Sequence, residues 1–256
     1  MRIQNVEQVQ GQYFFRYDEF GAHTEAPPHS HSWGHLNYAL RGSMRMETEQ
    51  GHWVSPPQYG VWIPPGVVHG CYVTQAVVYR SVYLAPALCA ALPAQPCSLR
   101  IGPIVRAILA DFAARELHEP RSDADLRLAR VLYDQLLAVP VESGYLPAAE
   151  HPALVQVLEA MRAAPHDHRS LAAWADSVHL TERTLARHCQ RELGMSLGEW
   201  RQRMRYLQAI DALEAGASVQ SIAYDLGYGT PSAFIAMFQR EAGMSPEQFR
   251  REFCAA

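Results

Sequence analysis

Histidine is concentrated in two short segments near the start of the chain. His29, His31 and His35 stand close together, and His69 follows the turn-forming segment 64–66. Neutral imidazole is a ligand for zinc, nickel, copper and iron. Side chains two positions apart on a strand point to the same face. His29 and His31 are therefore expected to lie on one strand and to point to the same face of it. The spacing predicts a metal site or a polar binding pocket.

The segment that must position these histidines reads as β-structure. From Tyr13 to about Pro86 the chain is rich in aromatic and β-branched residues, and its short apolar runs are separated by turn signals such as Gly42-Ser43 and Gln50-Gly51. Such evenly spaced short runs are typical of a barrel or a sandwich. We assign residues 1–100 to a β-barrel domain.

The histidine segments resemble the two motifs of the cupin barrel, HxHxxxE and PxGxxH, with His35 in place of the glutamate. In metal-binding cupins these residues converge, so the resemblance implies a divalent metal (Zn, Ni, Fe or Cu) on His29, His31, His35 and His69. Four neutral ligands leave the metal charge uncompensated, which favours an additional anionic ligand. Two alternatives remain: a metal-free organic pocket, or inert barrel histidines. Trp33, Trp53 and Trp62 are candidate pocket walls, although a barrel core explains them equally well.

Residues 101–140 predict two amphipathic helices, because apolar residues recur every three or four positions. Their stripes include Ile104, Ile108, Leu128, Val131 and Leu132. Such helices after a barrel either complete its core or form the face of a homodimer. Residues 141–150 contain Gly144 and Pro147 and are expected to be a linker, and residues 151–256 read as helical throughout.

An internal repeat marks the helical segment. Gln190-Arg191-Glu192-Leu193-Gly194-Met195-Ser196 recurs as Gln239-Arg240-Glu241-Ala242-Gly243-Met244-Ser245. Each copy predicts a short helix, a sharp turn and a second helix capped by Thr181 or Thr230. One helix over 197–214 is expected between them. Helices of this arrangement can place their N-terminal parts in the major groove of DNA.

The segment SIAYDLGYGTPSAF at 221–234, followed by GMSP at 243–246, resembles the signature of the AraC/XylS family, and the likeness covers about residues 151–253. The resemblance implies that both recognition helices read bases, the first with Arg183, Ala186 and Arg187 and the second with Pro231, Ser232 and Ala236. Thr181, Thr230, Gln239 and Arg240 are placed for phosphate contacts, and His188 is a weaker candidate. His179 departs from the family, which usually has glycine at this turn.

Composition constrains the function only weakly. The chain has 256 residues and a net charge of −4, and its 22 basic residues are all arginine, so only a local arrangement of arginines can attract DNA. Five cysteines without CxxC spacing argue against a disulfide framework. No apolar run is long enough for a membrane helix and no export signal is evident, so we expect a cytoplasmic protein.

Together these patterns predict an α+β multidomain protein: a cupin-like barrel, two helices, and a tandem helix-turn-helix domain. The expected function is a ligand- or metal-responsive, sequence-specific transcriptional regulator of double-stranded DNA, without catalytic residues. The alternative is a metal-dependent cupin enzyme that carries a DNA-binding module. A third reading is a constitutive DNA binder whose barrel serves only to dimerise.

Overall fold

The computed structural model describes residues 11–49, 51–56, 58–73, 76–142 and 145–251. The chain divides between Tyr145 and Leu146 into two compact units. Within the described residues, no helix combines the length and hydropathy needed to span a membrane. Four cysteines of the described part, Cys71, Cys89, Cys97 and Cys189, are free thiols.

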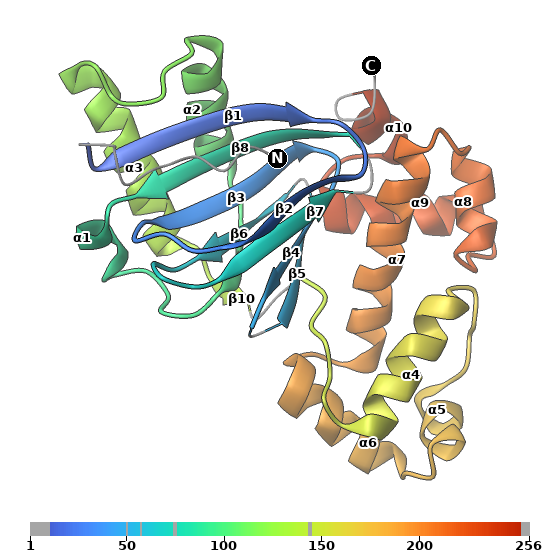
Figure 1. The fold of residues 1–256 in the computed structure, drawn as a ribbon. Helices are drawn as coiled ribbons and strands as arrows, with labels where there is room; N and C mark the ends of the chain where they lie inside the picture. Colours follow the sequence, from blue (N-terminus) through green and yellow to red (C-terminus); the bar gives the residue numbers. More distant parts are fainter. Residues whose placement is uncertain (1–10, 50, 57, 74–75, 143–144, 252–256) are drawn as a thin grey trace. The chain divides into compact units, whose positions relative to one another are not determined.

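The N-terminal unit contains two antiparallel sheets (Figure 1), which confirms the expected β-rich fold as a two-sheet sandwich of the cupin-like kind. One sheet has six strands in the order β1-β8-β3-β6-β9-β10, and the other has four in the order β2-β7-β4-β5. The strands are β1 (Tyr13–Phe20), β2 (Thr24–His29), β3 (Gly34–Arg41), β4 (Met44–Thr48), β5 (Gly51–Ser55), β6 (Tyr59–Ile63), β7 (His69–Val73), β8 (Val77–Leu84), β9 (Cys97–Arg100) and β10 (Val141–Glu142).

The six-stranded sheet buries a different core on each face, because successive side chains of a strand alternate. On the outer face, Leu36 and Trp62 belong to a cluster with Leu109 and Leu132 of the helices α2 (Pro103–Ala114) and α3 (Asp123–Ala138). On the inner face, Ala39, Val61 and Tyr79 pack with residues of the second sheet, including Met44, Met46 and Trp53. A short helix, α1 (Pro86–Cys89), follows β8.

Two details differ from the expectations for residues 101–150. Val141 and Glu142, assigned to the linker, form β10 and pair with Leu99 and Ser98 of β9. Helix α3 buries Ala129, Leu132 and Leu136, which confirms Leu132 and Leu136 of the expected stripe but not Leu128 and Val131. Leu128 and Val131 therefore stay 37% and 41% exposed. Periodicity alone could not separate these two stripes because both recur at helical spacing.

The C-terminal unit is helical, as expected. Its elements are α4 (Pro152–Ala163), α5 (Leu171–Ser177), α6 (Glu182–His188), the π-helical turn η2 (Cys189–Leu193), α7 (Leu197–Glu214), α8 (Val219–Asp225), α9 (Pro231–Ala242) and α10 (Pro246–Phe249). Trp174, Leu185 and Trp200 belong to the core of its first half. In the second half, Phe238 packs against Phe234, Phe249 and Tyr206 of α7.

The sequence repeat is a repeat of capping structure. Serine and threonine side chains accept hydrogen bonds from backbone N–H groups at the starts of corresponding helices, which satisfies donors that the helix leaves unpaired. The pairs of N-caps are Ser170 and Ser218, Thr181 and Thr230, and Ser196 and Ser245. Gly194 and Gly243 both take left-handed backbone at the ends of the second helices. The unit is therefore two copies of one helix-turn-helix motif, joined by α7.

Candidate functional sites: a histidine cluster and two recognition helices

The four histidines singled out by the sequence come together in the N-terminal unit. His29 is the last residue of β2, His35 lies near the start of β3 and His69 begins β7. The expectation that His29 and His31 share a strand is wrong, because β2 ends at His29 and His31 lies in the following loop. His29 and His69 still face each other as partners across the β2–β7 pair, and His31 folds back beside them.

Three of the histidines form a group with the geometry of a metal site. Each of His29, His31 and His69 offers one ring nitrogen, and these atoms lie within 4.8 Å of one another. The fourth ring, His35, is outside that group of three but adjacent to it, with its centroid 4.7 Å from those of both His31 and His69. The rings of His29 and His69 are 4.4 Å apart.

The backbone fixes how three of these rings are oriented. Their Nδ1 atoms lie at hydrogen-bond distance from carbonyl oxygens: 2.9 Å for His29 and Pro27, 2.6 Å for His31 and Trp33, and 2.8 Å for His69 and Val67. A neutral imidazole that donates from Nδ1 carries its lone pair on Nε2, as a metal ligand requires. Nε2 of His69 and both ring nitrogens of His35 are buried without a hydrogen-bond partner.

The surroundings of His35 and His69 keep these two rings neutral. The pKa of His69 is lowered to about 4, chiefly by burial and to a smaller extent by the neighbouring His29 and His31. The hydrogen bond to the carbonyl of Val67 opposes this shift. Burial, followed by the charges of His69 and His31, holds the pKa of His35 well below its ordinary value. Neutral imidazole is the form that binds a metal.

A buried polar network adjoins the cluster, and the sequence reading missed it. The ring of Tyr83 lies 4.8 Å from that of His35, and its hydroxyl is hydrogen-bonded to the side chain of Arg16, which is 8% exposed. Tyr79 donates to Oδ1 of Asn37 over 2.6 Å, while Nδ2 of Asn37 is buried without a partner. The available signal was a set of polar residues two positions apart: Arg16 and Asp18 on β1, His35 and Asn37 on β3, and Tyr79, Ser81 and Tyr83 on β8. The sequence alone could not show that these side chains face inward.

The three candidate tryptophans lie in different places. Trp33 packs with Phe14 and Tyr83, close to the histidines, and Trp53 belongs to the core between the sheets. Trp62 is not a wall of the interior, which corrects the expectation. It lies on the outer face of β6 in the core with α2 and α3, and its indole N–H donates to Pro93.

Helix α6 presents a recognition face in the C-terminal unit. Arg183, Ala186 and Arg187 are exposed, while Leu185 on the opposite side is buried in the core. Thr181 is exposed at the N-cap, where its hydroxyl accepts from the N–H of Thr184. His188 is turned inward instead: it is 8% exposed and its ring lies 3.9 Å from that of His151, so it is not placed for a phosphate contact.

Helix α9 presents the corresponding face of the second copy. Its buried side consists of Phe234, Met237 and Phe238. The other side is open to solvent or partly so and carries the expected contacts Thr230, Pro231, Ser232, Ala236, Gln239 and Arg240. Figure 1 shows α7 between the two motifs of this unit. Each candidate DNA contact thus stands on the side of its helix that the core leaves uncovered.

Two family models and the sequence relatives agree with this architecture. The model of the AraC-like ligand binding domain matches residues 13–137, and that of a helix-turn-helix domain matches 174–252. The HTH-type transcriptional regulator NimR of Escherichia coli is 34% identical over 224 residues, 88% of this chain and 82% of NimR. A putative AraC-like transcription regulator of Streptomyces lividans is 31% identical over 50% of this chain and 43% of its own. ToxT from Vibrio cholerae aligns over 96% of this chain and 99% of its own, at 8% identity and a TM-score of 0.42.

The fold, with its ligand-binding sandwich and tandem helix-turn-helix motifs, is that of a DNA-binding transcriptional regulator and not of an enzyme. The chain belongs to the AraC family of such regulators.

Proposed function

We propose that the sandwich senses a divalent transition metal through His29, His31, His35 and His69, and that metal binding changes the affinity of the C-terminal unit for its operator. The observation that carries the proposal is the convergence of three imidazole nitrogens within 4.8 Å, with the Nδ1 atoms held by backbone carbonyls. The buried, unpartnered nitrogens of His35 and His69 fit such an ion, because buried polar atoms otherwise cost free energy.

The donor set favours zinc, nickel, copper or iron, since imidazole suits all four. Four neutral ligands leave the charge of a divalent ion uncompensated. Arg16, buried beside Tyr79 and Tyr83, is ion-paired with Asp18, so the pair does not supply a compensating negative charge to the cluster. An anion is therefore the expected co-ligand, and it would supply the negative charge that the four imidazole ligands lack.

On the DNA side, we propose that Arg183, Ala186 and Arg187 read bases through α6, and that Pro231, Ser232 and Ala236 read them through α9. Thr181, Thr230, Gln239 and Arg240 would contact phosphates. Helix α7 has 18 residues and spans about 27 Å at about 1.5 Å per residue. A rod of this length separates the two motifs by a distance close to the repeat of B-DNA, about 34 Å, so two successive major grooves are within reach.

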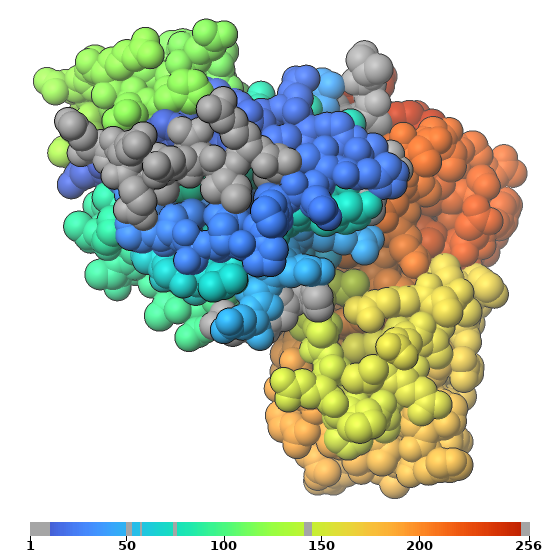
Figure 2. Space-filling view, in the orientation of Figure 1, coloured from blue at the N-terminus to red at the C-terminus, as the bar shows by residue number. Residues whose placement is uncertain are grey.

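We also propose a homodimer formed through α2 and α3. Four large apolar side chains of this segment stay exposed, namely Ile104, Leu128, Val131 and Leu137, at 37–47%. Both helices lie at the surface of the N-terminal unit, green in Figure 2. A two-fold axis would bring identical stripes together and cover them, which is the usual solution for a symmetric pair.

The test of metal sensing has two parts. Metal analysis of the purified protein is expected to find a transition metal in the wild type, and less in His31→Ala and His69→Ala. Operator affinity, measured by fluorescence anisotropy at fixed salt, is expected to change when a chelator strips the wild type and to be indifferent to chelation in the two variants. His23→Ala, an exposed histidine of the same unit, is the matched control. Wild-type protein that binds metal but shows unchanged operator affinity would disprove the sensor function.

The second candidate is a metal-free organic pocket. The aromatic ring of Tyr83, 4.8 Å from His35 and 5.5 Å from His31, favours it because aromatic walls are common around organic ligands. The same experiment separates the two, since chelation has no effect on a metal-free pocket. The His35→Gln variant sharpens the distinction: it removes a ligand nitrogen but preserves a hydrogen-bonding side chain.

A further inference from the structure

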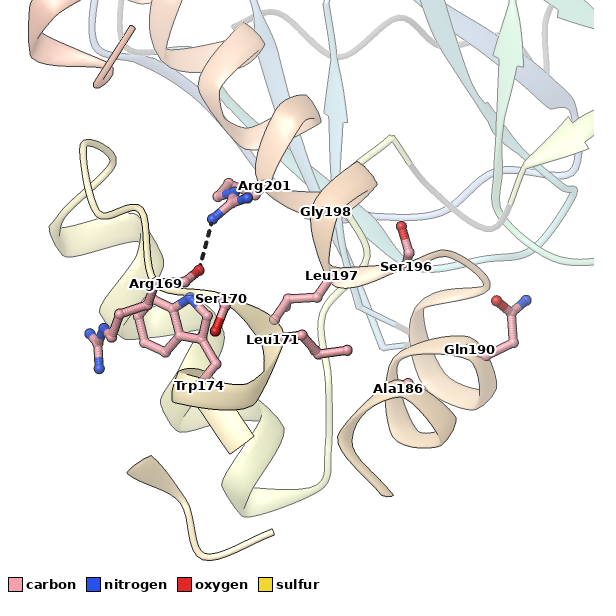
Figure 3. A pocket seen from close by; sticks show the side chains of 10 residues that line it. All are labelled: Arg169, Ser170, Leu171, Trp174, Ala186, Gln190, Ser196, Leu197, Gly198 and Arg201. Carbon is pink, nitrogen blue, oxygen red and sulfur yellow. Dashed lines mark hydrogen bonds between the residues drawn. The ribbon is translucent and has the colours of Figure 1, made fainter. Parts of the chain in front are cut away.

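One face of helix α7 holds the chain segment that connects α4 to α5. Arg201, Arg205 and Gln208 stand four and three positions apart on α7, so their side chains form one stripe of the helix. Nη1 of Arg201 donates to the carbonyl oxygen of Arg169 over 3.3 Å, the dashed line of Figure 3. Nε2 of Gln208 donates to the carbonyl oxygen of Arg162 over 3.4 Å. The stripe therefore fastens this connection by its backbone.

Arg205 lies in the middle of this stripe and is buried, with 7% of its surface exposed. Its Nε donates to the carbonyl oxygen of Pro165 over 2.8 Å, and its Nη2 donates to that of Asp167 over 3.3 Å. A buried charge is costly unless its N–H groups are hydrogen-bonded. The guanidinium therefore cannot leave segment 165–167 without a loss of free energy.

The same guanidinium contacts the second helix-turn-helix motif. It lies 5.4 Å from the centroid of the Tyr228 ring and is hydrogen-bonded to the hydroxyl of that side chain. Tyr228 follows the turn residue Gly227, and its ring lies 5.8 Å from that of Phe234 on α9. Gly227 in turn packs so closely against the backbone of His166 that a Cβ would not fit. Segment 165–167 thus lies directly against the turn of the second motif.

Segment 165–167 is also tied to the first motif. Oδ1 of Asp167 accepts from the N–H of Arg169 over 2.7 Å, and Oδ2 accepts from Nε of Arg169 over 2.8 Å. The guanidinium of Arg169 lies 3.6 Å from the centroid of the Trp174 ring, which belongs to α5 and to the core of the first half (Figure 3). Ser170, the next residue, is the N-cap of α5. Arg205 is therefore bonded on one side to the entrance of the first motif and on the other to the turn of the second.

We propose that Arg205 is a positioning residue that fixes the two recognition helices relative to each other, and so sets the spacing of the two half-sites that one chain reads. The half-sites are the segments of the operator that α6 and α9 contact, so the inference rests on the proposed function. The length of α7 sets the distance between the motifs, and the bonds of Arg205 set their relative rotation. One base pair turns B-DNA by about 35° and lengthens it by about 3.4 Å. A reader with a fixed rotation therefore tolerates little change in spacing.

The test uses the full-length protein and an operator selected from a random library, with one base pair inserted or removed between the half-sites. The wild type is expected to lose affinity about tenfold or more, because one motif loses its base contacts. Arg205→Lys keeps the charge but lacks the planar fork that serves two carbonyls at once, so the same change of spacing should cost it only about threefold. Tyr228→Phe removes the hydroxyl, keeps the ring beside Phe234 and should reduce the spacing penalty in the same direction.

Arg203→Lys is the matched control, because it makes the same exchange two positions earlier on α7, where the side chain points in a different direction. It should keep the spacing penalty of the wild type. Single-base substitutions within each half-site should cost Arg205→Lys and Tyr228→Phe as much as they cost the wild type, since each motif stays intact. A changed base preference within one half-site would overturn the proposal, because Arg205 would then support a single motif.

A wild-type spacing penalty in Tyr228→Phe and in Arg205→Lys would also overturn it. If Arg205→Lys fails to fold, Tyr228→Phe decides alone. An operator with the second half-site scrambled tests the proposed function by itself. Wild-type protein that binds this operator as tightly as the intact one would disprove reading by two motifs, whereas variants that keep a strict spacing would disprove only the role of Arg205.

Discussion

His179 and Gly227 occupy the same turn in the two helix-turn-helix motifs, and both have left-handed backbone, with φ of 56° and 81°. They are not interchangeable. A Cβ on Gly227 would lie 2.7 Å from Cα of His166 and 2.9 Å from its carbonyl oxygen, closer than real Cβ atoms approach. The second motif therefore requires glycine for space as well as for conformation. The first motif accepts a histidine, at the cost of a strained residue.

This difference predicts opposite responses to substitution. Gly227→Ala is expected to destabilise the C-terminal unit by about 1–3 kcal/mol, because it adds both strain and a clash. His179→Gly is expected to stabilise it by at most about 1 kcal/mol, since relief of the left-handed strain exceeds the entropy cost of glycine only slightly. Chemical denaturation measures both. Gly229→Ala, with no atom within 4 Å of the added Cβ, is the control. Equal losses at 227 and 229 would contradict the steric explanation.

Base reading by α6 has a separate signature. Arg187→Ala is expected to cost about 1–3 kcal/mol of binding on a selected operator, to relax preference at one base pair and to leave mixed-sequence DNA unaffected. Arg240→Ala, an exposed arginine of α9, is expected to weaken all duplexes alike, because its proposed partner is a phosphate. Anisotropy titrations on a panel of single-base operator variants distinguish the two. A uniform loss for Arg187→Ala would reassign it to the backbone.

Metal binding is expected to stabilise the folded sandwich. A ligand that binds only the folded state adds about 2.7 kcal/mol at a free concentration one hundred times its Kd. Added Zn²⁺ should raise the temperature at which the sandwich of the wild type unfolds, as measured by scanning calorimetry. The His69→Ala variant should not show this shift. His118→Ala removes a histidine that bonds to Phe15 outside the cluster, and should retain it. A metal-induced shift that survives in His69→Ala would exclude the proposed ligand set.

Glu192 predicts acid sensitivity of the first motif. Burial raises its pKa, but the N–H of His151, the guanidinium of Arg191 and the N–H of Glu150 outweigh this and hold the pKa at about 2, below the ordinary 4.5. A depressed folded-state pKa gives stability that is complete above 4.5 and is lost as pH falls toward about 2. Glu192→Gln should therefore lower the free energy of unfolding by about 1–3 kcal/mol at neutral pH. It should also reduce the loss of stability between pH 4.5 and about 2.

The control for Glu192 is Glu159→Gln, an exposed carboxylate on α4. Denaturant midpoints recorded from neutral to acid pH give both comparisons. If the two variants follow the same curve as the wild type, the hydrogen bonds of Glu192 to the start of α4 do not contribute to stability.

The proposed dimer is tested by charge at its centre. Val131→Asp places a carboxylate on the exposed stripe of α3 and should yield monomers, as measured by sedimentation equilibrium. Arg45→Asp places a carboxylate at an exposed position of β4, in the other sheet, and should leave the mass unchanged. A wild type that sediments as a monomer at all accessible concentrations would refute the interface.

The sequence predicted most of the C-terminal unit because caps and turns are local. The N-caps Thr181 and Thr230 and the bounds of α7 follow from short-range chemistry and agree with the structure. Because the motif occurs twice, the caps and turns of one copy supported those of the other. In contrast, the π-helical turn η2 had no signal, since it depends on how the end of α6 packs.

The N-terminal unit was less predictable because its site depends on pairings between distant strands. The motifs identified the four histidines, but the strand assumed for His31 was wrong, and of the two roles left open for Trp62 the structure supports the core. Tyr83 and Arg16 were missed altogether, since alternation along β8 and β1 does not show which face is inward. Only the register of β1 with β8 and of β8 with β3 puts them beside His35.

Two adjacent residues of strand β3 face different sides of the sheet. His35 points into the sandwich among the imidazoles, while Leu36, the next residue, packs in the core shared with α2 and α3. The peptide between them is planar and stiff, and both residues are held by ladders to β6 and β8. A displacement of the His35 backbone would therefore displace Leu36 as well. If the interior binds a metal as proposed, this strand gives a direct route from the imidazoles to the core beneath α2 and α3, without a hinge or lid.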